Sequence, residues 1–275
     1  MSNQIDIAQK LGKIALIGGG KMGEAIIAGL VQGAMFDPEV IVIAEPGAER
    51  RQQLTEAYGT VCVANGAEIS NPDTCILAVK PQVLKDIASD LAQTEGFNPK
   101  RVISIAAGIS TQTLREIFQF AQIIRVMPNA PLMVGAGMSA VAVSAGTQKS
   151  EGELVVDLFS LMGEAVLVEE NLINAATAIS GSGPAYFALF VEHLTLAGIN
   201  LGLTPEQSSS LAIQTFNGTA RQLQLTDMTP AQLRMAVTSP KGTTAAALES
   251  FSRDDFAQIV QNAAQAALQR AEELA

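Results

Sequence analysis

Cysteine and histidine are scarce in this sequence. Its 275 residues include two cysteines and one histidine. Two cysteines cannot build the disulfide framework of a small secreted protein, and zinc sites need clustered Cys and His ligands. We therefore predict neither a disulfide nor a metal site. Cys62 and Cys75 each lie in a short apolar run, and we expect both to be buried thiols.

Charged residues are few, and positive charge is the scarcer sign. Charged residues make up 16% of the chain and apolar residues 48%, with 17 Lys and Arg against 27 Asp and Glu. Such a composition indicates a globular chain. A net charge of −10 argues against a nucleic-acid-binding protein, which needs a basic patch. The low charged fraction also suggests that a partner subunit covers part of the surface.

Long uninterrupted apolar runs are missing. The longest uncharged stretch, residues 126–148, is broken by prolines and glycines, whereas a membrane helix needs about 20 mostly apolar residues. The first ten residues lack the basic-then-apolar pattern of a signal peptide. We expect a cytoplasmic protein with no membrane association.

The first part of the chain alternates between strand and helix signals. Continuous apolar runs at residues 13–17, 40–44, 61–64, 74–79 and 102–106 predict strands, and residues 23–32, 48–58, 81–93 and 111–118 predict helices. This alternation is typical of a parallel sheet covered on both faces, as in a Rossmann-type doubly wound α/β fold. Two runs without a clear helix between them, at 123–127 and 138–143, extend the sheet and can be partly antiparallel. Residues 165–168 can form the last strand.

Helix signals dominate after Val168. Thr204 and Thr229 each precede a proline and have glutamine three positions later, which predicts two capped helices. We expect Ser252 to cap the final helix, with acidic residues following it. The helix at 184–197 is apolar nearly all round, so two subunits should share this region. We predict a dinucleotide-binding domain at 1–168 and a helical substrate-binding and dimerisation domain at 169–275.

A glycine-rich turn follows the first predicted strand. Gly18, Gly20 and Gly23 match the pattern G-x-G-x-x-G, with Lys21 and Met22 inside it. The first glycine permits the tight turn, the second lets a pyrophosphate approach the backbone, and the third lets helix and strand pack closely. The amide groups at the start of the helix then hold the phosphates. The alternative interpretation is a glycine-rich turn without a ligand.

The second predicted strand ends at an acidic residue. Glu45 can bind the ribose hydroxyls of NADH and would repel the 2′-phosphate of NADPH. Arg50 and Arg51 follow closely and can bind that phosphate, or they can form an exposed helical face that pairs with Glu49. We favour NADH slightly and leave NADPH open.

Polar residues follow other predicted strands. Lys80 and Pro81 follow the fourth predicted strand, at the edge where doubly wound folds bind ligands. Lys80 can act as an acid, but we prefer a charge near the pyrophosphate or a strand-end cap. Asn129 can orient a nicotinamide amide or simply belong to a proline-punctuated loop. His193 lies in the middle of a helix, where packing or an interface explains it best.

Two segments of the helical half stand out. Residues 180–186, Ser-Gly-Ser-Gly-Pro-Ala-Tyr, place small residues before a helix and permit close approach of backbone or ligand, or close helix packing. Residues 238–244, Thr-Ser-Pro-Lys-Gly-Thr-Thr, precede a short helix at about 243–250. Their N–H groups and hydroxyls suit a carboxylate, although an ordinary capped turn has the same pattern.

Together these motifs resemble the pyrroline-5-carboxylate reductase family. The match runs from Ile14 nearly to the end of the chain, with the glycine turn, Ala-Val-Lys-Pro at 78–81, Met-Pro-Asn at 127–129 and the two helical-half segments in the family's order. The resemblance implies reduction of 1-pyrroline-5-carboxylate to L-proline with NAD(P)H. It also implies a homodimer interlocked through the helical domain, built in some members into a larger ring such as a decamer.

The same resemblance assigns site residues. It implies cofactor binding by the glycine turn and Asn129, together with Ala78, Val79, Lys80 and Pro81; Glu45 joins this set from its position after the second predicted strand. Ser239, Gly242, Thr243 and Thr244 correspond to positions that hold the substrate carboxylate, with Thr244 near the imine nitrogen in the catalytic role. Two positions depart from the family: Lys241 stands where many members carry glycine, and Glu45-Pro46 stands where NADPH-preferring members often carry Asn-Arg or Ser-Arg.

Two other functions compete with this one. A β-hydroxyacid dehydrogenase shares the two-domain plan but uses a catalytic Lys and Asn on a second-domain helix, and Lys241 is the only lysine of the helical half. A non-catalytic dinucleotide sensor would keep the glycine turn but would not need the segment from Ser239 to Thr244.

Overall fold

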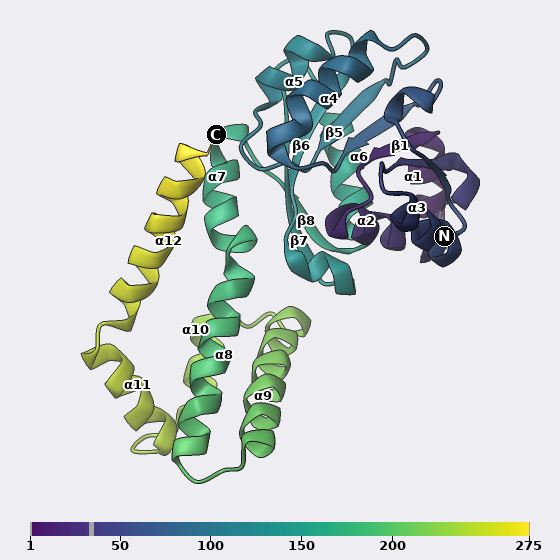
Figure 1. Ribbon diagram of the computed structural model, residues 1–275. Coiled ribbons are helices and arrows are strands. Elements are labelled where there is room, and N and C mark those ends of the chain that lie inside the picture. Colours follow the sequence, from purple (N-terminus) through teal and green to yellow (C-terminus); the bar gives the residue numbers. More distant parts are fainter. Residues whose placement is uncertain (1, 33–35, 275) are drawn as a thin grey trace. The chain divides into compact units, whose positions relative to one another are not determined.

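The chain folds into two compact units. A computed structural model describes residues 2–32 and 36–274 (Figure 1). The first unit comprises Met1–Ser182 and Ala267–Ala275, and the second comprises Gly183–Ala266. The sequence predicted a boundary after residue 168 between a cofactor domain and a substrate domain, and this functional division stays a prediction.

An eight-stranded sheet forms the centre of the first unit. Its order is β3-β2-β1-β4-β5-β6-β7-β8, and only the β6–β7 pair is antiparallel. The first six strands therefore follow the doubly wound order 3-2-1-4-5-6, which confirms the predicted fold class. The strands are β1 (Ile14–Ile17), β2 (Ile41–Ala44), β3 (Val61–Val63), β4 (Thr74–Leu77), β5 (Arg101–Ser104), β6 (Gln122–Met127), β7 (Gly137–Val143) and β8 (Gly163–Leu167).

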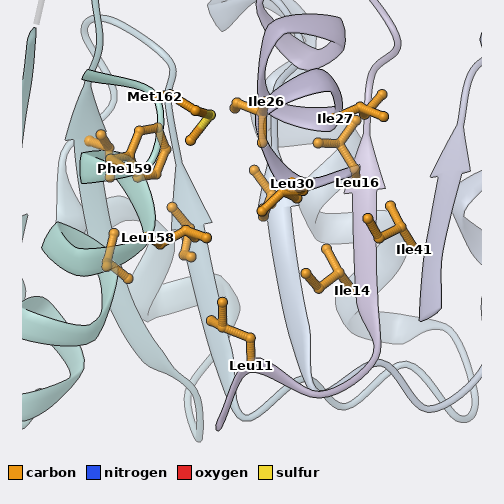
Figure 2. Packing of buried hydrophobic residues seen from close by; sticks show 14 of the residues in the cluster. Leu11, Ile14, Leu16, Ile26, Ile27, Leu30, Ile41, Leu158, Phe159 and Met162 are labelled. Atoms are coloured by element: carbon orange, nitrogen blue, oxygen red, sulfur yellow. The ribbon is translucent and has the colours of Figure 1, made fainter. Parts of the chain in front are cut away.

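Helices cover both faces of this sheet and create two cores. One face carries α1 (Ser2–Leu11), α2 (Lys21–Gln32), α3 (Ala48–Tyr58) and α6 (Lys149–Ser160), and the other carries α4 (Pro81–Gln93) and α5 (Thr111–Ile117). Figure 2 shows the first core, where Ile26 and Leu30 of α2 face Leu158 and Phe159 of α6, all fully buried. The sheet is thus covered by apolar side chains on both sides.

Helices α1 and α6 were not predicted. In α1, Ile7 and Leu11 are buried four positions apart, a pattern too short to read from sequence. In α6, Gly152 weakens the helical signal, yet a Cβ there would lie 2.7 Å from a methyl group of Val143. Close packing of α6 on the sheet therefore explains a residue that disfavours helices.

The second unit contains only helices among its described residues. They are α8 (Gly183–Asn200), α9 (Pro205–Leu225), α10 (Pro230–Ala236), α11 (Thr243–Arg253) and most of α12 (Phe256–Glu273). Both predicted capping boxes, at Thr204 and Thr229, are present. The predicted cap at Ser252 is wrong, because Ser252 lies inside α11. The chain turns instead at Asp255, whose φ of 55° lies in the left-handed region.

Candidate cofactor and substrate sites

The glycine turn joins β1 to α2, and each glycine has a distinct steric role. Gly18 has a φ of 108°, which side-chain-bearing residues rarely adopt. A Cβ on Gly23 would lie 2.1 Å from the carbonyl oxygen of Gly18, so only glycine lets α2 begin there. A Cβ on Gly20 would meet nothing within 4 Å. Open space at the second glycine, beside the first amide groups of α2, fits a dinucleotide pyrophosphate.

The loop after β4 lies against this turn. A Cβ on Gly18 would be 2.8 Å from the carbonyl oxygen of Ala78 and 3.0 Å from a methyl group of Val79. The two loops meet because β1 and β4 are neighbours at the point where the strand order reverses, which is where doubly wound folds bind dinucleotides. Gly18 and Ala78, sixty residues apart in the sequence, therefore lie next to each other at the carboxyl edge of the sheet.

Lys80 occupies the N-cap of α4, and Pro81 is the first helical residue. The N-cap normally favours Ser, Thr, Asp or Asn, and a cation there opposes the helix dipole. Lys80 is exposed, and its side chain makes no capping hydrogen bond. Local folding therefore does not explain this lysine, whereas a bound anion at the same edge of the sheet would.

Glu45 lies beside the glycine turn at the end of β2. Its Oε2 accepts a hydrogen bond from the N–H of Gly19 at 3.0 Å, and its Oε1 accepts one from the N–H of Gly47 at 2.9 Å. These two bonds fix the orientation of the carboxylate. The Glu45 side chain, which the sequence analysis predicts to bind the ribose, is thus held next to the glycine turn.

Arg50 does not pair with Glu49. Its Nη2 lies 2.5 Å from Oε2 of Glu24, in the first turn of α2, and its Nε donates to the carbonyl oxygen of Gly19 at 2.8 Å. Arg51 donates to the carbonyl oxygens of Glu45 and Pro46. The sequence analysis offered Glu49 as the partner of an exposed arginine face, and this is wrong for Arg50, which pairs with Glu24. Sequence reasoning missed Glu24, which resembles an ordinary acidic residue at a helix start.

Asn129 connects three segments of the first unit. Its Oδ1 accepts from the N–H of Met138 at 2.8 Å, and its Nδ2 donates to the carbonyl oxygen of Ser180 at 3.0 Å. Ser180 belongs to a π-helical turn, Thr177–Gly181, and a Cβ on Gly181 would lie 3.2 Å from the methyl group of Met127. The structure therefore brings the motif at 127–129 into contact with the start of the motif at 180–186. The sequence showed only the order of these motifs along the chain.

We expect Asn129→Ala to destabilise the protein by about 1–3 kcal/mol, because it leaves the partly buried N–H of Met138 and C=O of Ser180 without these partners. Asn129 is only 9% exposed, so water cannot easily replace the lost bonds. Thermal unfolding checks this, with Asn217→Ala on the exposed side of α9 as the matched control. An Asn129→Ala protein as stable as the control would contradict the bridging role.

The segment before α11 is a tight turn. The N–H of Gly242 donates to the carbonyl oxygen of Ser239 at 3.0 Å, with Pro240 and Lys241 between them. Lys241 has a φ of 60°, the left-handed position that glycine fills in such turns. A Cβ on Gly242 would lie 2.4 Å from the Ser239 hydroxyl. Gly242 is the N-cap of α11, so the first amide groups of the helix, beginning at Thr243 and Thr244, lack intrahelical partners.

A partly buried ion pair, also missed by sequence reasoning, holds the chain after β8. Glu170 accepts hydrogen bonds from the N–H and the hydroxyl of Thr111, and it lies 3.8 Å from Arg125 in β6. Burial lowers the pKa of the Arg125 guanidinium, and the nearby Glu170 opposes that shift. The contacts anchor the entry into α7 (Ile173–Ala176) on the sheet.

Other chemistry is sparse in residues 2–32 and 36–274. No group of three or more His, Cys, Asp or Glu side chains there could hold a metal ion. Both cysteines are free; Cys75 is buried, while Cys62 is only half-buried, contrary to the expectation for it. Burial raises the pKa of the Cys75 thiol. Among the described helices, none has the length and apolar character needed to span a membrane.

Comparison with known proteins identifies the family. The curated pyrroline-5-carboxylate reductase of Synechocystis sp. is 40% identical over 95% of this chain and 98% of its own length, and that of Corynebacterium melassecola is 38% identical over the same shares. The chain belongs to the pyrroline-5-carboxylate reductase family. The family described as pyrroline-5-carboxylate reductase dimerisation matches residues 170–274, and that described as NADP oxidoreductase, coenzyme F420-dependent, matches residues 13–108.

Solved structures agree with this assignment. The pyrroline-5-carboxylate reductase of Coxiella burnetii has a TM-score of 0.88 and 32% identity, covering 96% of this chain and 99% of its own. The pyrroline carboxylate reductase of Plasmodium falciparum, solved with NADP bound, has a TM-score of 0.82 and 28% identity, covering 96% and 98%. The predicted family, the reductase class and the NAD(P)H cofactor are thereby confirmed. The site residues and the choice between NADH and NADPH stay predictions.

Proposed function

We propose that this protein reduces 1-pyrroline-5-carboxylate to L-proline by hydride transfer from NAD(P)H, the last step of proline biosynthesis. The observation that carries the proposal is similarity along the whole chain to curated reductases of that name. The fold supports it, because the glycine turn is built for a dinucleotide and the family's dimerisation segment follows the sheet. A β-hydroxyacid dehydrogenase receives no such support.

We assign the first unit to the cofactor. Gly18, Gly20 and Gly23 shape the turn, and Lys21 and Met22 supply the start of α2. Glu45 orients the ribose, Lys80 adds positive charge near the phosphates, and Ala78, Val79, Pro81 and Asn129 line the same edge of the sheet. When bound, the reduced nicotinamide supplies the hydride. The task of the chain is to hold this donor and the substrate in a reactive orientation.

We assign the second unit's turn to the substrate carboxylate. The hydroxyls of Ser239, Thr243 and Thr244 and the amide groups at the start of α11 are donors suited to a carboxylate. Gly242 leaves the space that these donors need. We propose that Thr244 faces the imine nitrogen, where the proton must arrive when the hydride reaches the imine carbon.

The experiment is oxidation of NADH and NADPH by the purified protein in the presence of 1-pyrroline-5-carboxylate. We expect turnover that depends on the imine. We expect Thr244→Ala to lower kcat about a hundredfold or more, since a positioned proton donor contributes roughly 10²–10⁴-fold. Cofactor affinity should change less than about twofold. Unchanged kcat would remove Thr244 from the mechanism. Turnover on β-hydroxyacids but not on the imine would overturn the function.

We also propose a homodimer formed through the helical segment. In the second unit few side chains are buried, while Phe187, on α8, is 56% exposed although it touches Phe216 of α9. Such an apolar surface needs a partner. The other large exposed apolar residues include Leu189, Phe190, Leu194, Leu196, Leu211, Ile213, Phe251, Phe256, Ile259 and Val260. Sedimentation should give a dimer or a multiple of it, and the decamer is the larger ring we propose to look for.

Cytoplasmic location stays a prediction from the sequence. Fractionation of cells that express the protein is the direct test.

A further inference from the structure

The second strand and the glycine turn carry a charge arrangement that the family assignment does not explain. Arg50, the cation closest in sequence to Glu45 on α3, has all three side-chain nitrogens engaged. Nε donates to the Gly19 carbonyl at 2.8 Å, Nη2 to Glu24 at 2.5 Å, and Nη1 to Gln53 at 3.3 Å. Its charge is therefore balanced inside the protein before any cofactor arrives.

Tyr58 also contacts the Glu24 carboxylate that binds Arg50. Its hydroxyl donates to Oε1 of Glu24 at 3.2 Å, so the Glu24 carboxylate receives Arg50 on one oxygen and Tyr58 on the other. Burial raises the pKa of the Tyr58 phenol, and the adjacent Glu24 raises it further, so the phenol keeps its proton. The Glu24 and Arg50 side chains are 32% and 29% exposed, which leaves the pair partly shielded from solvent. Partly buried, hydrogen-bonded pairs of this kind are stronger than exposed ones.

Glu45 presents the opposite charge. Its carboxylate is fixed by the N–H groups of Gly19 and Gly47, and Arg51 bonds to the backbone carbonyl of Glu45 instead of to its side chain. Within residues 2–32 and 36–274, no arginine forms an ion pair with the Glu45 carboxylate. Hydroxyl groups of a ribose can donate to this carboxylate, whereas a 2′-phosphate would bring like charge against it.

We propose that this enzyme prefers NADH, and that Glu24 is the positioning residue that enforces the preference by keeping Arg50 on the Gly19 carbonyl. This inference rests on the proposed function only for which reaction the cofactor serves. If Glu45 alone excluded NADPH, a substitution at Glu24 would not change the affinity for NADPH. Our proposal instead makes that affinity depend on Glu24, a residue of α2 that need not touch the cofactor.

The test is direct binding of NADH and NADPH to the full-length protein by calorimetry, without substrate. We expect wild-type protein to bind NADH at least about tenfold more tightly, since juxtaposed like charges exclude the wrong ligand. Glu24→Gln should free Arg50, raise NADPH affinity about threefold to tenfold and change NADH affinity less than about twofold. Adding Arg50→Gln to Glu24→Gln should abolish that gain.

Two further variants keep the test decisive if Glu24→Gln does not fold. Arg50→Gln alone should leave NADPH affinity unchanged, because Arg50 is already occupied, and Arg51→Gln is the matched control on the same helix. A wild-type protein that binds NADPH as tightly as NADH would overturn the proposal. So would an Arg50→Gln or Arg51→Gln variant that loses NADPH affinity, or a Glu24→Gln variant that shifts both affinities equally.

These outcomes are separate from failure of the proposed function. Binding without substrate measures the cofactor choice alone, so an NADH preference with no turnover of 1-pyrroline-5-carboxylate would contradict only the proposed reductase function. Turnover with NADPH preferred would contradict only the inferred NADH preference.

Discussion

Gly20→Ala is expected to weaken dinucleotide binding about tenfold to a hundredfold without changing the stability of the free protein. A Cβ at Gly20 meets nothing within 4 Å, so the free protein accepts it. The same methyl group would occupy the space that we assign to the pyrophosphate, and overpacking of a filled site costs about 1–3 kcal/mol. Binding calorimetry and thermal unfolding measure the two effects separately.

Gly23→Ala is the matched comparison, because the same methyl group is added three positions later. There it would lie 2.1 Å from the Gly18 carbonyl oxygen and 3.3 Å from a methyl group of Leu16. Helix α2 must then move off β1, so stability and cofactor affinity should both fall. If Gly20→Ala destabilised the protein as much as Gly23→Ala, or if it kept full affinity, the assignment of the turn to the pyrophosphate would be wrong.

Gly242→Ala is expected to raise the KM for 1-pyrroline-5-carboxylate about tenfold or more, with cofactor affinity unchanged. The new Cβ would lie 2.4 Å from the Ser239 hydroxyl and 3.1 Å from the Ser239 carbonyl oxygen. The hydroxyl must rotate away and is lost as a donor to the carboxylate, and a hydrogen bond to a charged group contributes about 1.5–3 kcal/mol.

A double-mutant cycle tests this cause. If Gly242→Ala acts by displacing the Ser239 hydroxyl, then adding it to Ser239→Ala should raise KM little further. Fully additive effects would show that Gly242 acts independently of Ser239. An unchanged KM in both single variants would exclude this turn as the carboxylate site.

Features encoded locally were predictable from the sequence. The glycine turn was found because its spacing follows from the steric needs of one strand–helix junction. The caps at Thr204 and Thr229 were found because each uses residues within one helical turn. The sheet followed from apolar runs separated by helices, and the antiparallel β6–β7 pair followed from the missing helix between them.

Features that depend on contacts between distant segments were not predictable. Arg50 selects Glu24 over its neighbour Glu49 because α2 and α3 pack side by side on one face of the sheet. Asn129 was predicted as a nicotinamide contact, yet two of its polar groups bind the backbone at Met138 and Ser180. The left-handed backbone at Asp255 moved the start of the last helix; aspartate adopts this conformation more often than most residues, but the sequence does not show which aspartate does so.

The measurement that tests the central claim most directly follows the hydride itself. The protein is incubated with 1-pyrroline-5-carboxylate and NADH carrying deuterium at the transferable C4 position, and the product is analysed by mass spectrometry and NMR. We predict L-proline with one deuterium on the carbon that belonged to the imine, formed in equal amount to the cofactor oxidised. Cofactor oxidation without proline, or proline that carries no deuterium on that carbon, would contradict the account.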